Sequence, residues 1–174
     1  MDESRRERFE RVAPGLVEPL RRFLARRTDA ATADDVLAET LLVCWRRVEE
    51  LPDEPLPWAY AVARNCLRNA ERAARRQERV AARLAAEPAD PGPPGPPEDT
   101  ALDDALARLR PDDAELLRLW AWEQLTPAEI ATVLDITANA ASIRLHRARE
   151  KLKDQLRKIG AAAGHDGSRE GRRP

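Results

Sequence analysis

A stretch rich in proline and glycine at residues 87–100, EPADPGPPGPPEDT, constrains the fold of this chain more than any other feature. Its prolines and glycines prevent regular packing, and its acidic residues keep it solvated. The 174 residues are thereby divided into halves that must each bury a core. The sequence predicts one domain over 1–86, a flexible linker over 87–99 and a second domain over 100–159. A tail at 160–174 has no apolar period and is predicted to be disordered.

The composition predicts helices in both halves. Ala, Leu, Arg, Glu and Asp dominate, and aromatic residues make up 4%, which leaves little material for a sheet. We therefore expect an all-α protein of two small helical domains. The net charge is −1, so an argument for a nucleic-acid partner depends on where the charges lie.

The cysteines and the apolar runs indicate where the protein acts and whether it needs a cofactor. Cys44 and Cys66 lack zinc-site spacing and fall on the apolar sides of predicted helices, as buried thiols in a reducing cytoplasm do. No apolar run approaches the roughly 18 residues that span a bilayer. We expect a cytoplasmic protein with no membrane insertion, no metal and no other cofactor.

The first half contains the pattern of three helices. A helix is predicted over about residues 9–27, although Pro14 and Pro19 should break or displace its early turns. A second helix should open near Thr32 or Asp34. Its apolar seam alternates steps of four and three residues through Leu37, Leu41, Cys44, Val48 and Leu51.

The third predicted helix, from Trp58 towards Arg83, has a stripe of arginines. Steps of four and three residues keep them within a sector of about 100°. These six residues, which we name the arginine stripe, are Arg64, Arg68, Arg72, Arg75, Arg79 and Arg83. The stripe is either an ordinary solvated face or a track for a polyanion, since only Glu71 and Glu78 dilute its charge.

The second half begins with a strongly apolar helix that Pro111 starts, PDDAELLRLWAWEQ. Its large apolar residues are too many for one face, so we expect a central helix covered on two sides. These residues are Leu116, Leu117, Leu119, Trp120 and Trp122.

A helix-turn-helix pattern follows in LTPAEIATVLDITANAASIRLHRAREKL. Thr126 and Glu129 form a capping box around Pro127, and Thr137 caps the second helix. Asp135 stands in the turn where glycine would be easiest, and Asp tolerates left-handed geometry better than most residues.

The second helix of this pattern has an inner and an outer face. We expect the core to contain Ala141, Leu145, Ala148, Leu152 and Leu156. The outer residues suit the major groove, because Asn can pair with adenine, Arg with guanine and Ile with a thymine methyl. The flanking cations Arg144, Arg149, Lys151 and Lys153 could contact phosphates. The alternative is a solvated helix end whose basic residues suit the helix dipole. The predicted DNA-binding set is Thr126, Asn139, Ser142, Ile143, Arg144, His146, Arg147 and Arg149.

Three segments together resemble the extracytoplasmic-function (ECF) sigma factors of bacterial RNA polymerase. They are TADDVLAETLLVCWRRV, PWAYAVARNCLRNAERAARR and the helix-turn-helix segment, and they occur in the order of that family. The resemblance implies that the first domain binds the clamp helices of the largest polymerase subunit and opens the minus-ten promoter element. It implies that the second domain reads the minus-thirty-five element.

The resemblance also implies roles for single residues. The polymerase-binding set would be Asp35, Glu39, Thr40, Leu41 and Trp45, although Trp45 could equally be core. Ala38 and Leu41 depart from the Gln and Phe that the family often has there. The unpaired strand of the minus-ten element would be held by the loop at 52–57 together with Arg64, Asn65, Arg68 and Arg72. Trp58 and Tyr60 could stack on bases, with Trp58 alternatively in the core.

Two other classes of function remain for comparison. The helix-turn-helix alone would also fit an autonomous transcriptional regulator, but the basic helix of the first half argues against it. An enzyme is not expected, because the sequence has no glycine-rich phosphate loop, nucleophile elbow or metal-spaced His or Cys set. The expected partners are core RNA polymerase and promoter DNA. An anti-sigma protein is compatible with the resemblance, but no residue requires it.

Overall fold

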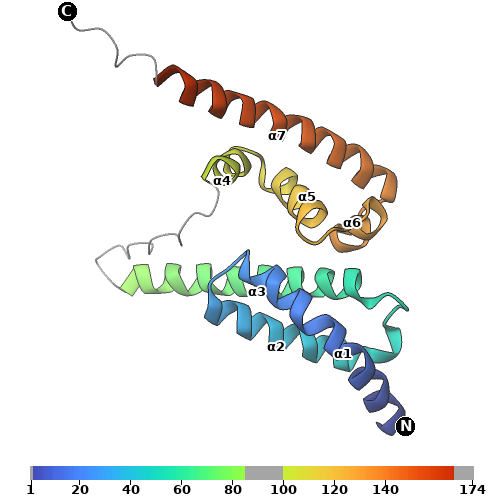
Figure 1. The fold of residues 1–174 in the computed structure, drawn as a ribbon. Coiled ribbons are helices and arrows are strands. Elements are labelled where there is room, and N and C mark those ends of the chain that lie inside the picture. The colour runs from blue at the N-terminus through green and yellow to red at the C-terminus, as the bar shows by residue number, and fades with distance from the viewer. Residues whose placement is uncertain (1, 85–99, 167–174) are drawn as a thin grey trace, which may run out of the picture. The chain divides into compact units, whose positions relative to one another are not determined.

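A computed structural model describes residues 2–84 and 100–166 of the protein, and these residues form helices joined by short connections (Figure 1). No strand occurs among them, so the predicted all-α class is confirmed. The predicted linker at 87–99 and the end of the predicted tail, from residue 167, lie outside the described residues. The chain divides into two compact units, essentially α1 to α3 and α4 to α7.

The first unit is a three-helix arrangement of α1 (Asp2–Ala25), α2 (Ala30–Arg46) and α3 (Pro55–Leu84), with a short 3-10 turn η1 (Val48–Glu50). Each helix packs against the other two. The Asp29 carboxylate caps α2 by accepting hydrogen bonds from the Thr32 backbone N–H at 3.0 Å and the Thr32 hydroxyl at 2.7 Å. The core contains Leu16, Leu20, Phe23, Leu24, Val36, Leu37, Cys44, Val48, Ala59, Tyr60, Ala63 and Leu67.

Helix α1 differs from the prediction because it begins at Asp2 and continues through both Pro14 and Pro19. Each proline removes one backbone donor and costs local helix stability. Buried side chains between and beyond the prolines, such as Leu16 and Leu20, pack this helix against α2 and α3. Tertiary packing therefore holds the helix where its local sequence disfavours it.

The second unit consists of α4 (Thr100–Ala107), α5 (Pro111–Ala121), α6 (Pro127–Leu134) and α7 (Ala138–Asp166). Helices α4 and α5 both pack against α7, the longest helix of this unit (Figure 1). The core contains Ala105, Leu106, Ala114, Leu116, Leu117, Leu119, Ile130, Val133, Ala141, Leu145 and Ala148.

Three expectations for this unit need correction. Of the large apolar residues expected to be covered, Leu116, Leu117 and Leu119 are buried, but Trp120 and Trp122, at the C-terminal end of α5, are 40% and 36% exposed. Leu156, expected in the core of α7, is 37% exposed. Helix α7 continues to Asp166, past Gly160, because the alanines that follow are the strongest helix formers. Among the described helices, none is long and apolar enough to cross a bilayer.

Candidate functional site

The start of α6 has the predicted capping box. The Thr126 backbone N–H donates to Glu129 Oε2 at 2.7 Å, and the Glu129 backbone N–H donates to Thr126 Oγ1 at 3.3 Å. The Thr126 hydroxyl also donates to the same carboxylate at 2.6 Å. These bonds satisfy backbone donors that a helix start leaves unpaired, so the entry into α6 is fixed.

The turn between α6 and α7 is equally well defined. Asp135 has φ 54°, the left-handed conformation that the sequence predicted for this position. The Ile136 backbone N–H donates to the Ala131 carbonyl at 3.1 Å, and Thr137 Oγ1 accepts from the Ala140 N–H at 3.1 Å. The two helices therefore form a helix-turn-helix with a capped second helix.

The outer face of α7 gathers the predicted DNA-binding residues on one surface. Ala141, Leu145 and Ala148 are buried. The opposite side and its flanks are exposed and carry Asn139, Ser142, Ile143, Arg144, His146, Arg147 and Arg149. Thr126 is also exposed, but its hydroxyl is already bound to Glu129. The surface combines hydrogen-bonding and apolar side chains with cations, the combination that a major-groove helix requires.

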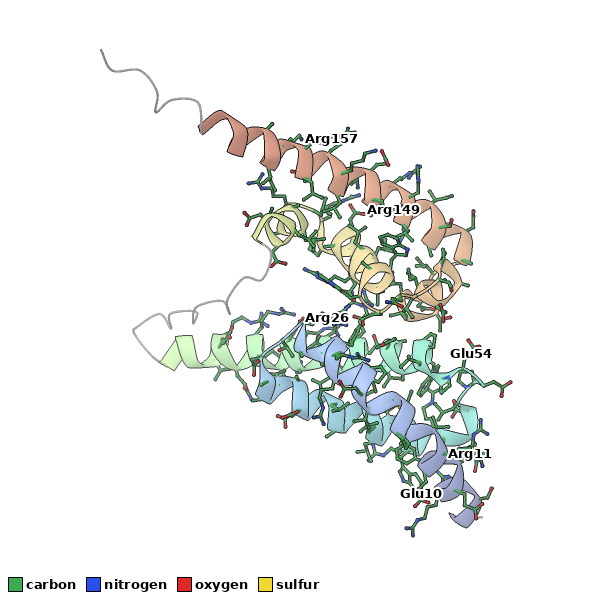
Figure 2. The ribbon with its side chains drawn as sticks, in the orientation of Figure 1. Glu10, Arg11, Arg26, Glu54, Arg149 and Arg157 are labelled. Atoms are coloured by element: carbon green, nitrogen blue, oxygen red, sulfur yellow. The ribbon has the colours of Figure 1, made fainter. Side chains whose placement is uncertain are left out.

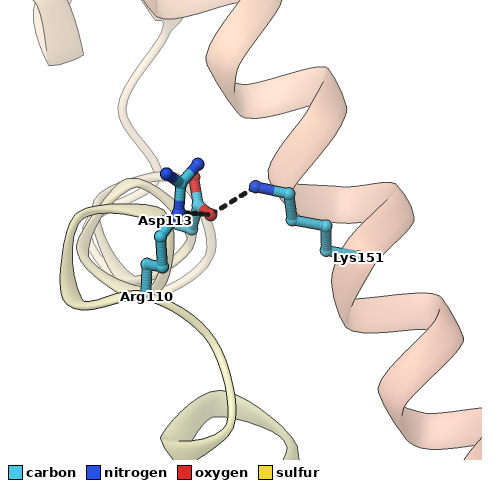
Figure 3. Close-up of polar contacts among 3 residues, drawn as sticks. All are labelled: Arg110, Asp113 and Lys151. Atoms are coloured by element: carbon cyan, nitrogen blue, oxygen red, sulfur yellow. Dashed lines mark hydrogen bonds and ion pairs between the residues drawn. The ribbon is translucent and has the colours of Figure 1, made fainter.

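Lys151, predicted as a flanking phosphate contact, instead forms an ion pair inside the unit (Figure 3). Its Nζ lies 2.6 Å from Asp113 Oδ2, and Arg110 Nε lies 3.4 Å from the same oxygen. Asp113 is 8% exposed. Burial alone would raise the pKa of this carboxyl, but the hydrogen bond and charge of Lys151, with those of Arg110, hold it below its ordinary value. The pair fixes the first turn of α5 to the middle of α7.

We predict that Lys151→Met lowers the free energy of unfolding at pH 7 by about 1–2 kcal/mol. This is below the about 3–5 kcal/mol of a fully buried pair, because the Lys151 side chain is 42% exposed. A carboxyl with a lowered pKa contributes stability above its unfolded pKa and loses it as the pH falls through the folded pKa. The difference between wild type and variant should therefore shrink below about pH 4.

Urea unfolding followed by circular dichroism at several pH values would measure this difference. Lys153→Met, which removes an exposed lysine from the same helix, is the matched control and should change stability little. A difference that stays constant from pH 7 to the acid range would show that the Asp113 charge is not its cause.

The arginine stripe lies along α3. Arg68, Arg72, Arg75 and Arg79 are exposed, Arg64 is half-buried, and the Arg83 side chain lies outside the described residues. Asn65 is exposed beside the first two arginines of the stripe. Arg75 pairs with Glu71 at 3.8 Å, and Arg79 Nε donates to the Arg75 carbonyl at 3.2 Å. The far end of the stripe is thus partly engaged within its own helix.

Of the two aromatic residues at the start of α3, the structure buries Tyr60 and leaves Trp58 partly exposed, whereas the sequence favoured Trp58 as the core residue. Tyr60 is 3% exposed and packs against Phe23 with ring centroids 5.0 Å apart, so it is a core residue and does not present its ring to a base. Trp58 is half-buried and lies under the Arg47 guanidinium at 5.3 Å. Arg47 in turn binds Glu50 through its Nε at 2.9 Å.

The predicted polymerase-binding residues of α2 lie in different environments. Asp35 and Glu39 are exposed, whereas Leu41 and Trp45 are half-buried. Trp45 contacts the Phe9 ring edge to face at 5.4 Å and the Arg5 guanidinium at 5.7 Å. Thr40 is fully buried, and its hydroxyl donates to the Val36 carbonyl at 2.7 Å. A direct contact between Thr40 and a partner would require this part of the core to open.

The surroundings of the two thiols disfavour their reactive thiolate form. Cys44 and Cys66 are free and buried, and burial raises the pKa of Cys44 to about 11 and also raises that of Cys66. Within the part of the chain that the structure describes, no three His, Cys, Asp or Glu residues are grouped to hold a metal ion.

Two residues of the second unit were not singled out from the sequence. Asp113 resembles an ordinary acidic residue in a first helical turn, and its partner is 38 positions away. Trp120 was expected in the core, yet its ring carries the Arg149 guanidinium, with Arg149 Cζ 4.6 Å from the ring centroid. The excess of large apolar residues in α5 was the available signal, because one face could not hide them all.

Both units match established protein families. Residues 9–77 match Sigma-70 region 2, and residues 99–152 match Sigma-70, region 4. The ECF RNA polymerase sigma factor SigL of Mycobacterium tuberculosis is 34% identical over 140 residues, which cover 76% of this chain and 78% of SigL. The RNA polymerase sigma factor CarQ of Myxococcus xanthus is 33% identical over 143 residues, which cover 77% and 80% of the two chains.

Solved structures share the fold at lower identity. The sigma factor RpoE of Bartonella quintana, crystallised with the anti-sigma factor NepR, has a TM-score of 0.64 and 19% identity, covering 86% of this chain and 96% of that chain. CnrH, solved with the cytosolic domain of CnrY, has a TM-score of 0.54 and 23% identity, covering 91% and 90%.

Proposed function

This chain belongs to the ECF sigma factors of RNA polymerase, and we propose that its two units divide the work of such a factor between them. As a sigma factor it binds core RNA polymerase and directs transcription initiation at specific promoters. We propose that it catalyses no reaction itself and acts in the cytoplasm, where it gives the polymerase its promoter specificity.

The second unit, proposed as a domain over 100–159, reads the minus-thirty-five element. The observation that supports this most is the outer face of α7, which a capped helix-turn-helix holds in place. The proposed base-reading residues are Asn139, Ile143 and Arg147, and the proposed phosphate contacts are Ser142, Arg144 and Arg149. His146 belongs to the same DNA-binding face without an assigned base. Thr126 would contribute from the start of α6, where its side chain is already ordered.

The first unit, proposed as a domain over 1–86, binds the polymerase and holds the unpaired strand of the minus-ten element. Arg64, Asn65, Arg68 and Arg72 are proposed to follow the strand, because they lie on one side of α3 at helical spacing. The proposed polymerase contacts are Asp35, Glu39, Leu41 and Trp45. Thr40 is proposed to support this surface from within the core. The segment at 87–99 would link the two domains.

Inhibition by an anti-sigma protein is proposed from two solved structures alone. RpoE of Bartonella quintana and CnrH share the fold of this chain, and each was solved with a partner, the anti-sigma factor NepR and the cytosolic domain of CnrY. A protein that covers the proposed polymerase-binding surface of α2 would prevent this chain from joining the polymerase.

Run-off transcription with purified core polymerase on genomic promoter fragments tests the proposed function. We expect transcripts of defined length only when both the chain and core polymerase are present. Free chain should bind the same promoter duplex weakly, because promoter recognition needs the polymerase. Tight, specific binding by the free chain without stimulated transcription would instead support an autonomous regulator.

A further inference from the structure

Trp120 of α5 is a large exposed aromatic residue with a defined partner. It is 40% exposed, and the Arg149 guanidinium of α7 lies over its ring, with Cζ 4.6 Å from the centroid. Figure 2 labels Arg149, which projects from α7. Both residues line a groove between α5 and α7 whose apolar part includes Leu117 and Leu152.

The contact leaves the hydrogen-bonding edge of Arg149 available. Trp presents the most attractive ring face to a cation, and the N–H donors of a guanidinium lie in its own plane, so a cation–π contact does not consume them. No carboxylate in the described part of the chain forms an ion pair with Arg149. Lys151, by contrast, is paired within the protein, because its ammonium group lies 2.6 Å from the Asp113 carboxylate.

Arg149 stands at the border of the proposed base-reading face. At about 100° per residue, it lies about 80° around α7 from Asn139, between that face and the buried Leu145. A cation at this border of a major-groove helix faces the DNA backbone and not the base edges.

We propose that Trp120 is a positioning residue that holds the Arg149 guanidinium ready to donate to a promoter phosphate beside the minus-thirty-five element. The inference rests on the proposed function of α7. The indole replaces the carboxylate that would ordinarily order such an arginine, so Arg149 is ordered while its charge stays available for the phosphate.

The test measures binding of holoenzyme to a duplex that carries the minus-thirty-five element and ends upstream of the minus-ten element, at several salt concentrations. Arg149→Ala should reduce the slope of log affinity against log salt by about 0.9. Trp120→Leu should weaken binding roughly two- to fivefold, in line with an exposed cation–π contact. Trp120→Phe should recover most of this loss, because it retains an aromatic face.

Two further variants separate positioning from other roles of Trp120. In the Arg149→Ala background, Trp120→Leu should have no additional effect on binding. Leu156→Ala, which alters an exposed apolar residue of the same groove, is the matched control and should leave the salt slope unchanged. Thermal unfolding of each variant would show that the second unit remains folded.

The outcomes distinguish a failure of the positioning role of Trp120 from a failure of the proposed function of α7. An equal effect of Trp120→Leu with and without Arg149, or a failure of Trp120→Phe to restore binding, overturns the positioning role. If Arg147→Ala changes base preference while Trp120→Leu and Arg149→Ala bind as wild type does, only the inference fails. If Arg147→Ala also leaves base preference unchanged, the proposed function of α7 fails.

Discussion

Arg147→Ala should lose about 1–3 kcal/mol of discrimination at one or two base pairs of the minus-thirty-five element. Arg147 is exposed on the outer face of α7, and an Arg in the major groove pairs with the O6 and N7 atoms of guanine. Asn139→Ala should have an effect of the same size at an adenine, because Asn139 is exposed in the first turn of the same helix.

Selection of preferred sequences with holoenzyme containing each variant would measure this loss. Lys153→Ala is the control, since this exposed residue lies nearer the C-terminus of α7 and should at most contact phosphate. It should weaken all sequences similarly and leave the preferred one intact. If neither Arg147→Ala nor Asn139→Ala changes the selected sequence, α7 does not enter the groove with this face.

Arg64→Ala combined with Arg68→Ala should reduce promoter opening by roughly tenfold or more, while affinity for core polymerase changes little. Each arginine is proposed to make a charged hydrogen bond to the displaced strand, and such a bond contributes about 1.5–3 kcal/mol. Promoter opening by the double variant should also depend less steeply on salt concentration than opening by the wild type, because fewer counterions are released.

Potassium permanganate footprinting of unpaired thymines would measure opening, and a binding titration would measure polymerase affinity. Arg76→Ala is a suitable control, because Arg76 is exposed on α3 but lies about 120° around the helix from Arg64. Unchanged opening with a collapse of polymerase affinity would assign the arginine stripe to the polymerase surface instead.

Local sequence rules predicted the elements whose boundaries depend on neighbouring residues. The Thr126 and Glu129 capping box, the cap at Thr137 and the left-handed Asp135 all occur as expected. Each is decided within a few residues, so the chain carries the complete signal. The same holds for the inner face of α7 near Leu145, where helical spacing alone selects the buried residues.

Features that depend on contacts across the fold could not be predicted in this way. The prolines of α1 indicated a broken helix, and only packing against α2 and α3 explains its continuity. Helical spacing did not reveal that Tyr60 would pack on Phe23 while Trp58 stayed partly exposed. The Asp113 and Lys151 pair joins two helices that no local pattern relates.

The candidate site shows the same division. Spacing grouped Asn139, Ile143 and Arg147 on one exposed face, because the helical period is fixed. The resemblance suggested Thr40 as part of a contact surface, whereas the structure buries it. A motif conveys which positions matter, and only the packing decides whether a side chain faces a partner or supports those that do.

Helix α7 is continuous from Ala138 to Asp166, so its two ends belong to one rigid element. Asn139, on the proposed DNA-binding face, and the exposed Leu156 are about 25 Å apart along the helix axis at about 1.5 Å per residue. The Asp113 and Lys151 pair lies between them and ties α7 to α5. Because no break interrupts the helix between Asn139 and Leu156, we expect a displacement at the Leu156 end to move the proposed DNA-binding end as well.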